Sequence, residues 1–311
     1  MKRLFSAVAA LALAAGIASA QDFYAAVEAF NMGAQTLESN KVEALAQFKS
    51  ALAQFEACEE AEAAEMIAQC KDAIPKTMLS IAKEQINEAQ YDEAIVTLKE
   101  TANVAKEYGI EEVAADATDL IPNAWSRKGA ALLKAKDFAN AAAAFKEVVA
   151  LTPEDGQSQL FYGQALMQAG NTDDAIPALE AAAAAGKAEQ AGKLLSTVYL
   201  KQGMALVKAG KSAEAIEILE KSNSYVESAN AYKLIASANT KLGKNAKAIE
   251  AYKKYLEVDP AAKDAADVMF TIAATAQKAG DKATAIEYYK KLSSNGKYAA
   301  QAAQQLGALQ K

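Results

Sequence analysis

The chain has 311 residues, of which 39 are acidic and 33 basic, and its formal net charge is −6. Binding to nucleic acid is not expected, because phosphate recognition needs a basic surface. The sequence also contains no histidine, which removes the commonest general base and metal ligand together with every serine–histidine or cysteine–histidine nucleophile pair. We therefore predict that the protein is not an enzyme and has no catalytic residue, cofactor or bound metal.

The first segment, residues 1–20, has the pattern of a secretory signal peptide. Two basic residues precede an apolar run from Leu4 to Ile17, and Ala18-Ser19-Ala20 provides an A-x-A cleavage site before Gln21. The apolar run is about fourteen residues long, whereas a membrane-spanning helix needs roughly twenty, so cleavage is favoured over a retained anchor. We expect a periplasmic protein, exported by a cleaved signal peptide, with no stable membrane insertion afterwards.

From residue 33 onward, small and large apolar residues recur in a fixed pattern. An alanine is followed four positions later by a large apolar residue at Ala44/Phe48, Ala94/Leu98, Ala141/Phe145, Ala175/Leu179, Ala215/Leu219, Ala248/Tyr252 and Ala285/Tyr289. An earlier small residue precedes each alanine by eleven or twelve positions, at Gly33, Ala82, Gly129, Gly163, Gly203, Ala236 and Ala273. In the last four repeats a turn glycine lies between the two small positions, at Gly170, Gly210, Gly243 and Gly280. Each repeat is therefore predicted to be two helices that cross closely at small residues, and the repeats must stack to bury their apolar faces.

The third repeat resembles the tetratricopeptide-repeat (TPR) family most clearly. The family pattern is followed by Trp125, Gly129, Leu132, Ala141, Phe145 and Pro153, whereas Lys128 stands where the family usually has leucine. The step from Gly129 to Gly163 equals the family period of 34 residues. The resemblance implies an all-α solenoid of about seven helix-turn-helix units.

The spacing of the repeats predicts the domain organisation. After the signal peptide we expect N-terminal TPR-like units with extra helical segments over 21–121, TPR units three to seven over 122–296 and a capping helix over 297–311. The prolines at 75 and 122 each suit the first position of a helix, which predicts a short additional helix before units two and three. Pro177 falls inside the second helix of unit four, where a kink or a late helix start is expected.

The only two cysteines, Cys58 and Cys70, could form a disulfide in an oxidising compartment. One continuous helix would hold them about 18 Å apart, beyond disulfide reach. A bond therefore requires the chain to reverse near Glu62 to Glu65, and the alternative of two buried thiols stays open.

The resemblance also implies a binding surface, because the family binds proteins and peptides mainly on the concave face lined by the first helix of each unit. The residues expected on that face are polar to basic: Lys83, Asn123, Ser126, Arg127, Gln164, Gln168, Lys201, Met204, Lys233, Ser237 and Lys241. We expect a periplasmic scaffold that binds protein or peptide partners of the cell envelope there. The alternative is a chaperone-like accessory factor in outer-membrane assembly or secretion, which would bind many unrelated extended peptides.

Overall fold

The computed structural model describes residues 19–59 and 61–309. The predicted signal peptide lies outside these residues, apart from Ser19 and Ala20, with which the first helix begins. The described residues form the α-helices α1 to α15 and one short π-helical segment, η2, with no strand among them. This confirms the predicted all-α class. The chain divides into two compact units, Met1–Thr152 and Pro153–Lys311, which we call the N-terminal body and the C-terminal body.

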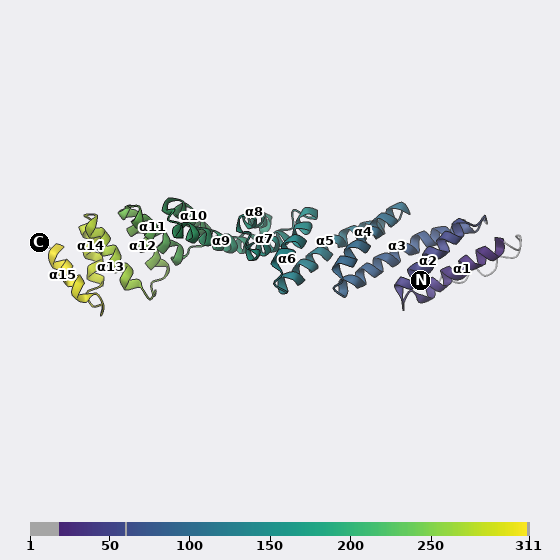
Figure 1. The fold of residues 1–311 in the computed structure, drawn as a ribbon, viewed down its shortest axis with the longest axis horizontal. Helices are drawn as coiled ribbons and strands as arrows, with labels where there is room; N and C mark the ends of the chain where they lie inside the picture. Colours follow the sequence, from purple (N-terminus) through teal and green to yellow (C-terminus); the bar gives the residue numbers. More distant parts are fainter. Residues whose placement is uncertain (1–18, 60, 310–311) are drawn as a thin grey trace. The chain divides into compact units, whose positions relative to one another are not determined.

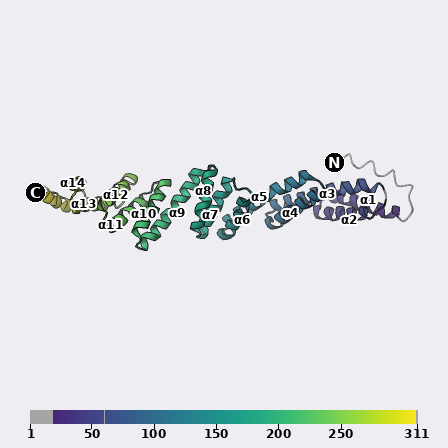
Figure 2. The same cartoon turned by 90° about the horizontal axis from the view of Figure 1, so that it is seen from above.

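The N-terminal body is a stack of helix pairs that follow one another in chain order. Its helices are α1 (Ser19–Thr36), α2 (Lys41–Glu56), α3 (Ala63–Asn87), α4 (Tyr91–Glu107), α5 (Glu111–Lys134) and α6 (Phe138–Leu151). Each helix packs against the next, and the first helices of successive repeats, α1, α3 and α5, also contact one another (Figures 1 and 2). Contacts restricted to neighbouring repeats are what defines a solenoid.

The C-terminal body repeats this arrangement. It comprises α7 (Gly156–Ala169), α8 (Thr172–Ala182), η2 (Ala183–Lys187), α9 (Ala188–Lys208), α10 (Ser212–Tyr225), α11 (Ala229–Lys241), α12 (Asn245–Val258), α13 (Ala265–Lys278), α14 (Lys282–Lys291) and α15 (Ala299–Leu309). The first helices α7, α9 and α11 contact one another in sequence, but such packing is minimal between α11 and α13. Ala302, Leu306 and Leu309 of α15, with Tyr298 just before the helix, pack onto the core of the last repeats.

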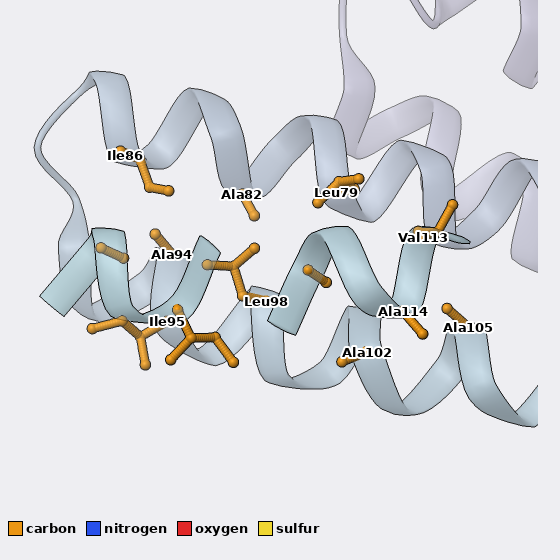
Figure 3. Packing of buried hydrophobic residues seen from close by; sticks show 13 residues of the cluster. Leu79, Ala82, Ile86, Ala94, Ile95, Leu98, Ala102, Ala105, Val113 and Ala114 are labelled. Atoms are coloured by element: carbon orange, nitrogen blue, oxygen red, sulfur yellow. The ribbon is translucent and has the colours of Figure 1, made fainter. Parts of the chain in front are cut away.

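The two small positions of each repeat lie where its paired helices cross, as the sequence pattern predicts. Figure 3 shows Ala82 of α3 facing Leu98 of α4, and both side chains are completely buried. Where the first helix carries glycine, the large side chain of the second helix packs directly against the glycine backbone. A β-carbon placed on Gly163 would lie 2.6 Å from the Leu179 side chain, and one on Gly203 would lie 2.5 Å from Leu219. The repeat register inferred from the sequence is therefore confirmed by packing.

The turn between paired helices always lies five residues before the second-helix alanine in repeats two to seven. In the last four repeats the residue at this place is a glycine with a left-handed φ of 71° to 91°. In repeats two and three the same place is taken by Ala89 and Lys136, with φ values of 62° and 61°. Left-handed backbone is strained for residues with a β-carbon, so these two turns are held by the packing of the helices around them.

The extra residues of repeats two and three lengthen their first helices instead of forming separate ones. Helix α3 has 25 residues with Pro75 inside it, and α5 has 24 with Pro122 inside it. The predictions of a helix start at each proline and of a separate short helix before units two and three were wrong. Each proline removes one backbone hydrogen bond, but the apolar face continues across it, with buried Ile74 and Met78 on either side of Pro75. That continuous buried face keeps the helix intact.

Pro177 also lies inside a helix, α8, which starts at Thr172 without delay. The interruption occurs further on, in η2, where Ala185 and Gly186 leave helical geometry and Gly186 has a φ of 88°. The same segment packs on the start of α7, because a β-carbon on Gly156 would lie 2.5 Å from the Ala185 carbonyl oxygen. Among the described residues, no helix is both long and apolar enough to cross a membrane.

Candidate protein-binding surface

All eleven residues expected on the binding face lie on first helices. In the N-terminal body, Lys83 is on α3, and Asn123, Ser126 and Arg127 are on α5. Three of these four side chains are exposed and Ser126 is half-buried. The remaining seven residues belong to the C-terminal body. The structure therefore brings the predicted residues together as two sets, one in each body.

The seven residues in the C-terminal body lie on three first helices that pack against one another. Gln164 and Gln168 are on α7, Lys201 and Met204 on α9, and Lys233, Ser237 and Lys241 on α11. We call these seven residues the first-helix face. Met204 is 49% exposed and lies three positions after exposed Lys201 on α9. Flexible, polarisable methionine is frequent on surfaces that bind varied partners.

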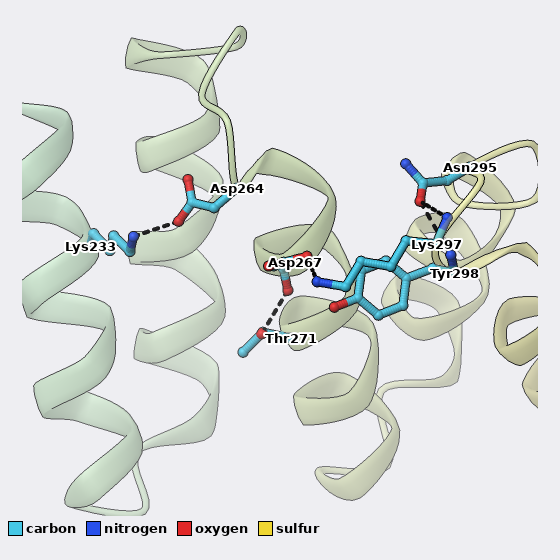
Figure 4. Close-up of polar contacts among 7 residues, drawn as sticks. All are labelled: Lys233, Asp264, Asp267, Thr271, Asn295, Lys297 and Tyr298. Atoms are coloured by element: carbon cyan, nitrogen blue, oxygen red, sulfur yellow. Dashed lines mark hydrogen bonds and ion pairs between the residues drawn. The ribbon is translucent and has the colours of Figure 1, made fainter.

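Lys233 is tied into an ion-pair network between repeats six and seven. Its ammonium group pairs with the carboxylate of Asp264, which directly precedes α13 (Figure 4). The same carboxylate accepts a hydrogen bond from the Tyr255 hydroxyl. The Lys233 nitrogen also lies 5.6 Å from the centre of the Tyr255 ring. The bonds from Lys233 and Tyr255 lower the pKa of Asp264, and the bond to Asp264, with burial, raises the pKa of Tyr255 to about 12. Lys233 therefore links neighbouring repeats as well as lying on the first-helix face.

A second ion pair holds the last repeat to the capping helix. Lys297 Nζ lies 2.8 Å from Asp267 Oδ1 on α13, and this hydrogen bond lowers the pKa of the Asp267 carboxyl (Figure 4). The Asn295 side chain accepts hydrogen bonds from the backbone N–H groups of Lys297 and Tyr298 at 3.0 and 3.2 Å, which fixes the turn before α15. Ion pairs thus join the start of α13 to α11 on one side and to the turn before α15 on the other.

Lys128, which departs from the family pattern, has a structural partner in the preceding repeat. Its ammonium group pairs with Asp92 in the first turn of α4 and lies 5.1 Å from the centre of the Trp125 ring. Two repeats later, Gln202 Nε2 donates to Asp173 Oδ1 at 2.7 Å in the same register. Sequence reasoning missed these bonds. The available signal was an aspartate two positions before the second-helix alanine, followed in the next repeat by a polar residue just before the first small position.

The two cysteines lie on either side of a chain reversal. Helix α2 ends at Glu56 and α3 begins at Ala63, so the chain turns just before the predicted place. The Cys58 thiol donates to the Gln54 carbonyl oxygen at 3.3 Å, and both cysteines contact the same apolar cluster. Burial, with the nearby Glu56 carboxylate, raises the pKa of the Cys70 thiol to about 12. The disulfide between them stays a prediction.

No group of three or more acidic or cysteine side chains in the described ranges is arranged to hold a metal ion. The acidic residues of the α2–α3 connection that the structure describes, Glu59 and Glu62, are exposed to solvent.

Comparison with known families gives one match. A family model described as tetratricopeptide repeat matches residues 122–191 and 200–268, and a second model with the same description matches 267–295. The sequence has no match among curated proteins.

Several solved structures are similar at low sequence identity. The MamA protein is 22% identical over 59% of this chain and 96% of its own, with a TM-score of 0.37. YrrB, described as a TPR protein with an unusual peptide-binding site, is 17% identical over 58% of this chain and 91% of its own, with a TM-score of 0.34. The pilF protein of Pseudomonas aeruginosa is 16% identical over 76% of this chain and 98% of its own, with a TM-score of 0.32.

Proposed function

Because the chain belongs to the tetratricopeptide-repeat family, we propose that it is a scaffold that binds partner proteins or peptides on its first-helix face. Solenoid repeats present extended surfaces of this kind to their partners. The observation that carries the proposal is the arrangement of α7, α9 and α11, which pack side by side and expose lysine, glutamine and methionine side chains.

The chemistry of this surface favours a partner segment with acidic and apolar side chains. Lys201 and Lys241 supply positive charge although the whole chain is acidic, and Lys233 lies on the same face with its charge paired to Asp264. Fixed charges of one sign increase the association rate of an oppositely charged partner, and salt screens this effect over about 8 Å at physiological ionic strength. Exposed Met204 offers an apolar contact among the lysines.

The proposed place of action is the periplasm. Support for this comes from the sequence of residues 1–20, which has a basic start, an apolar run and an A-x-A site. The partners would then be components of the cell envelope. N-terminal sequencing of the protein from fractionated cells tests this: a chain that begins at Gln21 in the periplasmic fraction supports the proposal, and one that retains Met1 contradicts it.

A charge-matched pair of triple variants tests the binding surface. Lys201→Ala/Lys233→Ala/Lys241→Ala removes three positive charges from first helices, and Lys221→Ala/Lys253→Ala/Lys290→Ala removes three from second helices. Binding kinetics are measured with a partner identified by cross-linking in native envelopes. The first triple variant should slow association severalfold, with the loss shrinking as salt rises, whereas the second should leave it nearly unchanged.

Melting curves of both triple variants are the control, because Lys233 pairs with Asp264 and Lys221 lies 4.5 Å from the Tyr199 ring centre. Equal sensitivity of partner binding to the two variants, with both folded, would remove the first-helix face as the binding surface.

A further inference from the structure

Lysines flank the turns between paired helices in the last three repeats. These turns join α9 to α10, α11 to α12 and α13 to α14. Each turn has one lysine before its left-handed glycine and one after it, and all six side chains are exposed: Lys208, Lys211, Lys241, Lys244, Lys278 and Lys282. Among the described residues, only Lys211 of these six forms an ion pair, with Glu214 of its own helix at 3.2 Å.

The three turns lie at the same edge of the C-terminal body. Short connections join each helix of this region to the next, so neighbouring helices run antiparallel. The first helices therefore all end, and the second helices all begin, at one edge. We call the six lysines at this edge the basic edge. One of them, Lys241, also belongs to the first-helix face, and the other five do not.

Helix stability does not explain the placement of three of these lysines. Lys211 and Lys244 are the N-cap residues of α10 and α12, and Lys282 is the first residue of α14. A helix N-terminus carries partial positive charge, which disfavours a cation, and the N-cap position prefers asparagine, aspartate, serine or threonine. The second helices of repeats one and three have such caps, Asn40 and Asp137. A lysine at the start of three consecutive second helices therefore favours a role in binding over one in folding.

The N-terminal body has an exposed edge of the opposite charge. Residues 21–152 include 22 acidic and 12 basic residues, whereas residues 153–311 include 17 acidic and 19 basic. Part of the acidic excess lies around the α2–α3 and α4–α5 connections, in segments 57–65 and 105–113, where Lys106 is the only basic residue. We call the six exposed glutamates of these connections the acidic edge: Glu59, Glu62, Glu65, Glu107, Glu111 and Glu112. None of the six forms an ion pair with another described residue.

The two edges match in charge and in repeat spacing. Both consist of the ends of stacked helix pairs, so successive charged connections are one repeat apart in each body. They are different surfaces of the same chain, so a contact between them in two copies is heterologous. Each copy then keeps one free edge, and the contact continues from copy to copy unless a ring closes.

We propose that the basic edge of one copy binds the acidic edge of a second copy, so that the protein assembles head to tail. The lysines of a turn face the glutamates of a connection, and this opposite charge increases the association rate and fixes the register of docking. Assembly does not require the first-helix face, because five of the six lysines lie outside it. The proposal is therefore independent of the scaffold function.

Sedimentation velocity of the full chain tests for assembly. At low salt the weight-average mass should at least double as the protein concentration is raised. High salt should return it to the monomer mass, because the Debye length falls from roughly 30 Å at 0.01 M to about 3 Å at 1 M ionic strength. A single monomeric species at every concentration in low salt would overturn the proposal.

Lys211→Glu/Lys244→Glu/Lys282→Glu removes the net charge of the basic edge. Glutamate is favoured at a helix N-terminus, so this variant should stay folded, which melting curves check, and it should be monomeric at low salt. Lys193→Glu/Lys263→Glu/Lys290→Glu is the charge-matched control, because it changes three exposed lysines of the C-terminal body outside the paired-helix turns. The control should assemble like the wild type. Equal assembly by the two variants would refute a role for the basic edge.

A second variant, Glu59→Lys/Glu62→Lys/Glu107→Lys, removes the net charge of the acidic edge and should also be monomeric alone. An equimolar mixture with the variant of the basic edge should form a one-to-one complex. In that complex the intact acidic edge of one protein meets the intact basic edge of the other. Loss of folding cannot produce this rescue. A mixture of the two folded variants that stays monomeric would contradict the pairing of the edges.

Vesicles that contain phosphatidylglycerol test the rival occupant of the basic edge, an anionic lipid surface. We expect wild-type assembly in solution without vesicles. Wild-type protein that stays monomeric, binds these vesicles at low salt and loses that binding in the variant of the basic edge would replace the second copy with a lipid surface. Cross-linking of a partner from Met204 is a separate readout, so failure of self-assembly is distinguishable from failure of the scaffold function.

Discussion

The Phe145 ring lies against the Gly129 backbone so closely that a β-carbon at position 129 would come within 2.8 Å of two ring carbons. Phe145 is fully buried at the crossing of α5 and α6. A rigid ring in a packed core has little room to move. The absence of a side chain at position 129 is therefore a condition for this helix crossing.

Gly129→Ala should lower the free energy of unfolding by about 1 kcal/mol. Overpacking a core costs about 1–3 kcal/mol, and the better helix propensity of alanine returns up to about 1 kcal/mol of it. Gly307→Ala is the matched control, since Gly307 is also helical but a β-carbon there would meet nothing within 4 Å. The control should be stabilising when both are measured by urea denaturation. A Gly129→Ala protein as stable as the Gly307→Ala protein would contradict the proposed crossing.

Replacing the non-glycine turn residues with glycine should stabilise the protein. Ala89 and Lys136 have φ values near 60°, a conformation that costs residues with a β-carbon roughly 1–2 kcal/mol. Lys136→Gly should raise the free energy of unfolding by about 0.5–1 kcal/mol after the extra chain entropy of glycine is subtracted. Ala135→Gly, one residue earlier with a φ of −75°, should instead destabilise. Thermal denaturation of both variants shows whether each substitution raises or lowers the stability of the protein.

Tyr255 should titrate at unusually high pH. Its hydrogen bond to Asp264 raises its pKa to about 12 from an ordinary value of 10. The folded protein therefore holds this proton more tightly than the unfolded chain, so the stabilisation is present below pH 10 and is lost as pH rises from 10 to 12. In Asp264→Asn the tyrosine pKa should fall toward 10, which ¹³C NMR of the tyrosine ring can follow. An unchanged pKa would mean that the hydrogen bond is not formed in solution.

Reduced Cys58 and Cys70 should differ in reactivity. The thiolate is the reactive form, and a pKa of about 12 leaves almost none of it at Cys70 near pH 8. Iodoacetamide should label Cys58 much faster than Cys70 in the folded, reduced protein, as read by peptide mass spectrometry. In urea the two rates should converge. Similar rates in the folded state would show that the Cys70 thiol is accessible to reagent and not buried.

The sequence predicts the helix pairs and their register well, because a close helix crossing requires small and large residues at fixed spacings. The contact between Gly163 and Leu179, for example, can be predicted from their spacing in the sequence alone. The long helices α3 and α5 were harder to predict, since Pro75 and Pro122 usually mark helix starts and only the surrounding tertiary contacts keep these helices continuous. At the break around Gly186, Ala185 packs against Gly156, a contact that no local sequence pattern encodes.

The candidate binding residues lie on first helices, as the repeat pattern predicts, but their partners were not foreseen. Lys233 bonds to Asp264 across 31 positions of sequence, and the orientation of such long side chains depends on how neighbouring repeats stack.

Site-specific photo-cross-linking in cells tests the central claim, binding by the first-helix face, most directly. A benzoylphenylalanine replaces either Met204 on α9 or Glu217, an exposed residue on the second helix α10. We expect a discrete adduct with a protein partner from Met204 that disappears when Lys201, Lys233 and Lys241 are changed to alanine, and no adduct from Glu217. The same adduct from Glu217, or one from Met204 that survives the triple change, would contradict it.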